Sequence, residues 1–155
     1  MAIQSDGALF AWGPNGGLHG DGTTAAKTTP TRIGNSLWKI VSAGYGNTLA
    51  IKNDNTLWSC GVGDRGSLGD GTTTYLRTSF AQVGSDTWLD VAAADRVCAA
   101  IRSDGTLWGW GLGGYVGNGT TADQLSPVQI ATGVWKAVAG YQLNFIAIQI
   151  GRAHV

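Results

Sequence analysis

Several common features of protein sequences are scarce or missing in this 155-residue chain. It contains no glutamate, and only 13% of its residues are charged. Because glutamate and lysine are common helix formers, this composition excludes a helical bundle. The chain has only two cysteines, Cys60 and Cys98, which is too few for a disulfide framework.

Membrane-spanning and phosphate-binding signals are missing as well. Ten basic and ten acidic residues give a net charge of zero and form no basic stripe, which disfavours binding to nucleic acid or to an anionic membrane. No apolar run approaches the roughly 20 residues that span a bilayer. The N-terminus lacks a basic segment followed by an apolar one, so it shows no secretory signal.

The abundant residues are those of strands and turns. The sequence has 25 glycines and seven tryptophans, it is rich in threonine, and 43% of it is apolar. Threonine and tryptophan favour strands, whereas glycine and aspartate favour turns. The apolar content with zero net charge argues against disorder. Low charge and abundant threonine slightly favour an extracellular or cell-surface setting over the cytoplasm, although localisation stays open.

A repeat of about 50 residues dominates the sequence. Ala-Ile recurs at residues 2, 50, 100 and 147, and a tryptophan precedes the last three copies by 12 residues in every case. Gly-Asp-Gly-Thr-Thr occurs at 20–24 and 69–73, with asparagine replacing aspartate at 117–121. The spacing before this loop drifts, whereas the interval from each of the first three Ala-Ile pairs to a closing glycine is always 11 residues. Paired strands cannot gain or lose a residue without a shift in register, whereas surface loops tolerate insertions. The constant intervals therefore predict paired strands, and the varying one predicts a surface loop.

These intervals predict four short strands in each repeat. Residues 48–60 indicate a hairpin, 38–41 and 135–138 indicate tryptophan-containing strands, and 31–33, 81–83 and 128–130 indicate a further separate strand. The expected fold is all-β, a β-propeller fragment of about three repeats of four-stranded antiparallel blades in an incomplete ring. The repeats cover about 2–49, 50–99 and 100–149, which together form a partial propeller over 1–149.

The motifs resemble one known family. Leu-Trp-(Ser/Gly)-(Cys/Trp)-Gly at 57–61 and 107–111, the Gly-Asp-Gly-Thr-Thr loops, and Trp-Lys-x-Val before Ala-Ile resemble the regulator of chromosome condensation repeat family, especially its bacterial form. The resemblance implies a closed ring of about seven blades, of which this chain would supply two complete blades and two halves.

Residues 150–155 break the repeat and resemble a translated sequencing adapter. They predict a non-native tail on a metagenomic fragment. The alternative is a natural three-repeat protein that closes a six-bladed ring as a dimer. If the chain is truncated, its unpaired sheet edges predict association.

No catalytic, cofactor or metal site is expected. His19 takes a core position that the other repeats fill with leucine and valine, and His154 lies in the suspected tail. Cys60 and Cys98 take positions that other repeats fill with larger residues, and both are interpreted as small buried apolar substitutes. Each glycine-rich loop carries at most one acid, which suits a turn better than a calcium site. The periodic tryptophans are expected to pack between blades.

The remaining candidate is a binding surface on the turns at 45–47, 95–97 and 142–144. The resemblance implies that these turns share one face of the propeller and contact a protein partner. The candidate residues are Tyr45, Asn47, Asp95, Arg96, Gln142 and Asn144.

The function predicted from the sequence is a non-enzymatic protein–protein interaction module within a larger repeat protein. Its partner is an unknown protein, with further blades or self-association also expected. The alternative is a structural or receptor-binding segment of a bacterial surface or phage adhesion protein. Guanine-nucleotide exchange on a small GTPase is less favoured.

Overall fold

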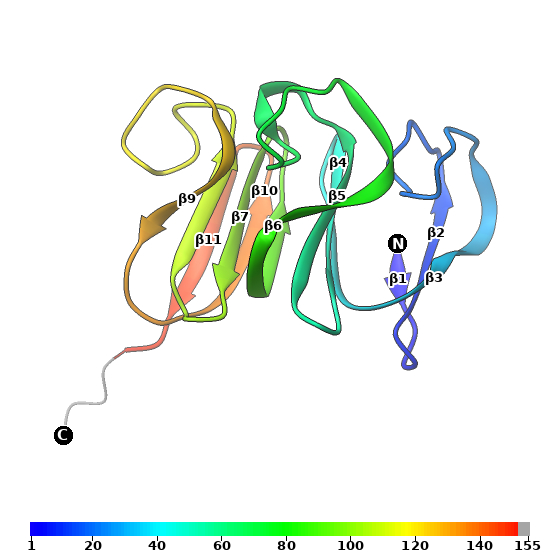
Figure 1. The fold of residues 1–155 in the computed structure, drawn as a ribbon, viewed down its shortest axis with the longest axis horizontal. Coiled ribbons are helices and arrows are strands. Elements are labelled where there is room, and N and C mark those ends of the chain that lie inside the picture. Colours follow the sequence, from blue (N-terminus) through cyan, green and yellow to red (C-terminus); the bar gives the residue numbers. More distant parts are fainter. Residues whose placement is uncertain (152–155) are drawn as a thin grey trace.

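The computed structural model describes residues 1–151 and consists of antiparallel strands that follow one another in an arc (Figure 1). Strands β1 to β9 are linked in sequence order, and β10 and β11 form a separate two-stranded sheet. A single 3-10 turn, Asp64–Gly66, lies among these described residues. Residues 1–151 contain no helix with the length and apolar character that a membrane crossing requires.

Two long strands connect neighbouring blades. Strand β3 (Lys27–Ala43) pairs with β2 through its first part and with β4 through its second, and β6 (Leu76–Ala93) links β5 to β7 in the same way. The sequence predicted two separate short strands at each of these places. The chain instead stays extended, and the pairing register shifts in the stretches that contain Gly34 and Gly84, each at φ +60°.

Two complete four-stranded blades lie in the middle of the arc. One consists of the end of β3, β4 (Asn47–Lys52), β5 (Thr56–Val62) and the start of β6. The other consists of the end of β6, β7 (Val97–Arg102), β8 (Leu107–Gly111) and β9 (Gln124–Ala131). The prediction of an all-β propeller fragment with antiparallel blades is therefore confirmed.

Partial blades occupy the two ends of the arc (Figure 1). At one end, β1 (Ala2–Ile3) and β2 (Ala8–Gly13) pair with each other, and β2 pairs with the start of β3. At the other end, β10 (Trp135–Tyr141) pairs with β11 (Asn144–Gln149). Residues 152–155 of the predicted tail lie outside the described residues.

The central hairpins share one register. Leu49 lies opposite Ser59 in the first, and Ala99 lies opposite Gly109 in the second. Their turns reverse through Asn55 at φ +70° and Gly105 at φ +86°, conformations that asparagine and glycine tolerate. The hairpin predicted at 48–60 is confirmed.

The core lies between successive blades. Leu49 and Ile51 are fully buried in a cluster that contains Trp88, Ala100 and Trp110 of the next blade. Trp38 and Trp88 are 4% and 1% exposed, and each meets a second tryptophan edge-on, at ring-centroid distances of 6.3 Å and 6.2 Å to Trp58 and Trp108. Such aromatic pairs contribute roughly 0.5–1.5 kcal/mol beyond their buried area.

Candidate protein-binding face

Three successive turns gather at the end of the sheets where β4, β7 and β11 begin. The turn before each of these strands contributes to a hollow of about 540 Å³, lined by Tyr45, Asp95, Tyr141 and Gln142 together with small residues. These side chains come from three neighbouring blades. The structure thus brings residues from all three predicted turns together, and we call this surface the turn face.

A second, smaller hollow adjoins it. Its volume is about 210 Å³, and its lining includes Tyr45, Asp64, Tyr75 and Arg96. The Arg96 Nε atom lies 3.4 Å from Asp64 Oδ2 of the preceding blade, so the arginine links two blades. Sequence reasoning missed Asp64 and Tyr75. The available signal was an aromatic residue within a polar, threonine-rich loop.

Three tyrosines project from this region. Tyr45 is 86% exposed, Tyr75 is 74% exposed and Tyr141 is 75% exposed. Tyrosine combines an apolar ring with a polar hydroxyl and loses little conformational entropy on binding, which explains its enrichment at protein interfaces.

The turns that carry these side chains are tightly built. The Gly44 N–H donates to the Asn47 carbonyl at 2.8 Å, and the Ala94 N–H donates to the Val97 carbonyl at 3.1 Å. Arg96 (φ +59°) and Gln142 (φ +51°) occupy the left-handed region that non-glycine residues seldom adopt. The Asp95 N–H also donates to the Gln142 carbonyl at 2.6 Å, which joins two turns directly.

The two predicted asparagines differ in position. Asn144 is exposed at the start of β11, whereas Asn47 is only 1% exposed and lies beneath the turn face. The Asn47 Nδ2 atom donates to the Ser67 carbonyl at 3.3 Å and lies 3.1 Å from Cys98 Sγ. Asn47 therefore supports the packing between blades and presents no side chain to a partner in this conformation.

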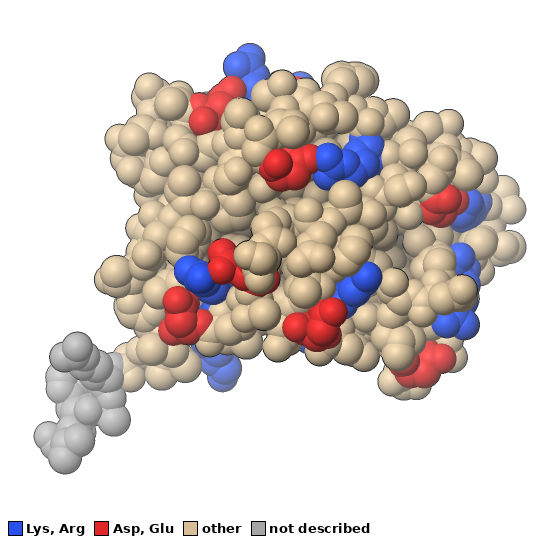
Figure 2. All heavy atoms as spheres, viewed as in Figure 1, with Lys and Arg blue, Asp and Glu red and all other residues tan. Residues whose placement is uncertain are grey.

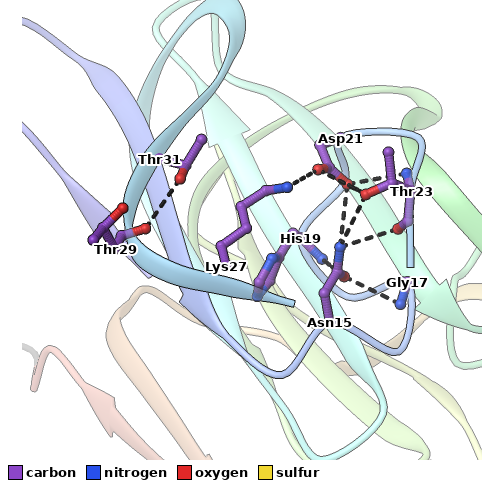
Figure 3. Close-up of polar contacts among 8 residues, drawn as sticks. All are labelled: Asn15, Gly17, His19, Asp21, Thr23, Lys27, Thr29 and Thr31. Atoms are coloured by element: carbon purple, nitrogen blue, oxygen red, sulfur yellow. Dashed lines mark hydrogen bonds and ion pairs between the residues drawn. The ribbon is translucent and has the colours of Figure 1, made fainter. Parts of the chain in front are cut away.

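The glycine-rich loops use their carboxylates internally. Asp21 forms a 2.5 Å ion pair with Lys27, accepts hydrogen bonds from Thr23, and is 3.3 Å from Asn15 Nδ2 (Figure 3). Burial opposes ionisation of Asp21, but these partners outweigh it and lower its pKa to about 2. In the next glycine-rich loop, Asp70 forms an ion pair with Arg77 and accepts a hydrogen bond from the Thr72 N–H. Among residues 1–151, no group of three or more potential ligands is arranged to hold a metal ion.

His19 and the two cysteines are buried. His19 is 4% exposed, its backbone N–H donates to Asn15 Oδ1 at 3.0 Å, and its Nδ1 atom has no partner within the described residues (Figure 3). Burial lowers the pKa of His19. Burial also raises the pKa of Cys60 and of Cys98 to about 12, which leaves both thiols protonated and unreactive at neutral pH. His154 lies outside the described part of the chain.

Blades of four antiparallel strands, stacked in an open arc with a shared face of turns, define a β-propeller built from repeats. Residues 38–67 match the family model of the regulator of chromosome condensation (RCC1) repeat, which confirms the family resemblance there. No curated protein sequence matches the chain.

Solved structures show the same fold. Human WBSCR16 superposes with a TM-score of 0.79 at 20% identity, over 95% of this chain and 41% of its own. Prp20p from Saccharomyces cerevisiae gives 0.82 at 22% identity, over 97% and 42%. Yeast RCC1 (Prp20) bound to Kap60 gives 0.80 at 18% identity, over 97% and 40%. The chain thus spans about two fifths of the length of these relatives.

Proposed function

We propose that the chain is a non-enzymatic protein-interaction module and that its turn face is the binding surface. The observation that carries this proposal is the convergence of three turns from neighbouring blades around one hollow, with Tyr45 and Tyr141 strongly exposed at its rim. Exposed tyrosines on hydrogen-bonded turns beside an arginine are residue types typical of interface hot spots. Asp95, Arg96 and Gln142 supply polar contacts around them.

The relatives support this proposal by analogy of fold. The structure of Prp20p was described with its binding to Gsp1p and histones, and a second structure holds yeast RCC1 bound to Kap60. In the view of Figure 2, acidic and basic side chains are interspersed and form no single-sign stripe. That surface suits a protein partner better than a nucleic-acid backbone.

Receptor binding within an adhesion protein and nucleotide exchange on a small GTPase stay predictions, because no particular feature of residues 1–151 favours either. The same holds for a bacterial origin and for an extracellular setting. Turnover of a substrate in a broad hydrolase panel, lost on a single substitution, would contradict the non-enzymatic assignment.

The proposal is tested by comparing proteins captured from a cell extract on three immobilised chains. These are the wild type, Tyr45→Ala/Tyr141→Ala, and a matched control, Leu37→Ala/Leu89→Ala. Leu37 and Leu89 are 45% and 46% exposed and do not line either hollow of the turn face.

The expected result is a protein that binds the wild type and the control but binds the tyrosine variant at least about tenfold more weakly. Near-ultraviolet circular dichroism verifies that all three chains are folded. Equal capture by the tyrosine variant, or loss of capture by the control alone, would show that the turn face is not the binding surface.

A further inference from the structure

A hollow lined by aromatic rings and cations lies between the partial blade of β2 and the complete blade of β4 and β5. Its volume is about 460 Å³. The rings are those of Trp38, Trp58 and Phe80, and the cations are Lys52 and Arg32. Lys52 is the last residue of β4, whereas the turn face lies where β4 begins. We call this separate site the aromatic hollow.

The aromatic rings form an apolar wall beside a positive charge. The Trp38 ring centroid lies 4.8 Å from that of Phe80 and 6.3 Å from that of Trp58. Trp58 and Phe80 are half-buried, so a ligand in the hollow can reach their rings. The Lys52 Nζ atom lies over the Trp58 ring, 3.6 Å from its centroid, which places the ammonium group next to this wall.

An equivalent hollow lies between the two complete blades. Its volume is about 340 Å³, and Trp88 lines it at the position that Trp38 has 50 residues earlier. Complete blades flank the equivalent hollow on both sides, and it is open nevertheless. No residue of β1, β10 or β11 lines either hollow. Both hollows are therefore features of the junction between successive blades and do not depend on the ends of the arc.

In the equivalent hollow, the chain supplies a carboxylate to the cation. Asp86 is part of the lining, and the Arg102 Nη2 atom lies 2.5 Å from Asp86 Oδ1. The guanidinium carbon of Arg102 also lies 5.2 Å from the Trp108 ring centroid, much as Lys52 lies over Trp58. A cation that contacts this tryptophan of the repeat therefore also has room for a carboxylate partner.

The aromatic hollow lacks that carboxylate. Ser36 takes the position of Asp86, and Lys52 takes that of Arg102, each 50 residues earlier in the chain. Arg32 adds a second positive charge where the equivalent hollow has an uncharged glutamine. Within residues 1–151, neither Lys52 nor Arg32 forms an ion pair.

Two acids close to this site already have other partners. Asp21 lines the aromatic hollow but forms its ion pair with Lys27 (Figure 3). Asp54, in the turn after β4, accepts hydrogen bonds from the N–H and the hydroxyl of Thr56 at 3.0 Å and 2.6 Å. The equivalent turn acid of the next blade is held by its threonine in the same way. The two cations of the aromatic hollow are therefore available to a carboxylate from outside the chain.

We propose that the aromatic hollow binds an organic carboxylate, with the carboxylate group at Lys52 and Arg32 and an apolar group against Trp58 and Phe80. Such a ligand supplies from outside what Asp86 supplies in the equivalent hollow. The volume and the mixed apolar and charged lining are typical of a small-ligand site. Charge-assisted hydrogen bonds are about twice as strong as neutral ones, so the carboxylate is expected to dominate recognition. The carboxylate belongs either to a small free acid or to an acidic side chain of another protein.

Titration followed by NMR tests the site. The probes are phenylacetate and phenylacetamide, a neutral molecule of nearly the same shape. Phenylacetate is expected to bind saturably and to shift the indole resonance of Trp58 more than that of Trp108, which has the same position in the next repeat. The amide is expected to bind at least about tenfold more weakly, because it makes no charge-assisted hydrogen bond.

Three variants test where the carboxylate group lies. Lys52→Met removes the charge but keeps an apolar stem beside Trp58, and it is expected to weaken phenylacetate binding about tenfold. Ser36→Asp introduces the carboxylate of the equivalent hollow, which is expected to pair with Lys52 and to weaken binding to a similar extent. Lys39→Met is the matched control, because Lys39 is exposed on β3 and does not line the hollow, and wild-type affinity is expected. The dispersion of each NMR spectrum verifies that the variant is folded.

A capped peptide with phenylalanine beside glutamate, and its counterpart with glutamine, distinguish the two sources of the carboxylate. Tighter binding of the glutamate peptide than of phenylacetate would support an acidic segment of another protein, and the reverse would support a small free acid.

The proposal would be overturned if neither phenylacetate nor the glutamate peptide bound saturably, or if phenylacetate and its amide bound equally well. Wild-type affinity in both Lys52→Met and Ser36→Asp would also overturn it. So would an equal loss of affinity in Lys39→Met and Lys52→Met, which would show that only the overall charge of the chain matters.

Discussion

At the residue scale, side chains with reactive groups serve the packing of this protein. His19 and both cysteines are buried. Burial lowers the pKa of the histidine and raises the pKa of each thiol, so all three side chains favour the neutral form. His19 occupies the position of Leu68 in the next repeat, and both residues are at most 4% exposed. The histidine is therefore a titratable substitute for an apolar residue.

His19 makes the stability depend on pH. Because its pKa in the fold lies below the ordinary 6.5, protonation favours the unfolded chain, and stability falls as the pH drops through 6.5 toward the folded pKa. We expect the unfolding free energy of the wild type to decrease between about pH 7.5 and about pH 5, and that of His19→Leu to stay nearly constant.

Urea denaturation at each pH measures this difference. Asp21 and Asp70 have lowered pKa values, so the loss of their contribution begins near their unfolded pKa and belongs to a more acidic range. Parallel pH profiles for the wild type and His19→Leu would contradict the assignment.

At the element scale, hydrogen bonds and aromatic packing hold successive blades together. The Leu18 carbonyl accepts from Thr48 Oγ1 of the following blade at 2.8 Å, and the Ser67 carbonyl accepts from Trp110 at 3.1 Å. These two loop carbonyls occupy the same repeat position. Each loop therefore attaches its own blade to the next one.

Two tryptophans on β8 allow the contact between blades to be compared with packing inside one blade, because Trp110 makes the first and Trp108 the second. Trp110 is fully buried at the blade interface, whereas half-buried Trp108 donates to Thr106 of its own blade. Trp110→Ala is expected to cost about 3–5 kcal/mol of unfolding free energy, and Trp108→Ala clearly less. Equal losses in urea denaturation would argue against the interface as the main source of stability.

At the scale of the whole molecule, the ends of the arc are less buried than its middle. Strands β4 and β7 consist almost entirely of buried residues, whereas Val138 alone is buried in β10 and no residue of β11 is buried. In a propeller, each blade is stabilised mainly by its neighbours. The end sheets should therefore open before the central blades do.

Hydrogen exchange of the chain tests this gradient. Amides of β4, β5, β7 and β8 are expected to exchange most slowly, and those of β10 and β11 fastest. A uniform exchange rate in all strands would indicate a single cooperative unit.

The repeat intervals allowed the blades to be predicted from sequence. The constant 12-residue interval from Trp38 to Ala50 and from Trp88 to Ala100 corresponds to one strand pairing repeated with the same register. A shift of the register by one residue would move every side chain of the strand to the opposite face of the sheet, so strand pairing keeps this spacing constant. The continuity of β3 and β6 could not be predicted, because glycine and polar residues before a tryptophan are equally typical of a break.

The sequence by itself determined the hairpin strands, their register and the three turns that carry the turn face, because these depend on contacts that recur at a fixed spacing. Only the tertiary structure decided that Asn47 is buried while nearby Tyr45 is exposed. Asn47 meets Ser67 and Cys98, which lie 20 and 51 residues away along the chain. Local sequence carries no record of such distant neighbours, so which turn residues are exposed depends on how adjacent blades pack.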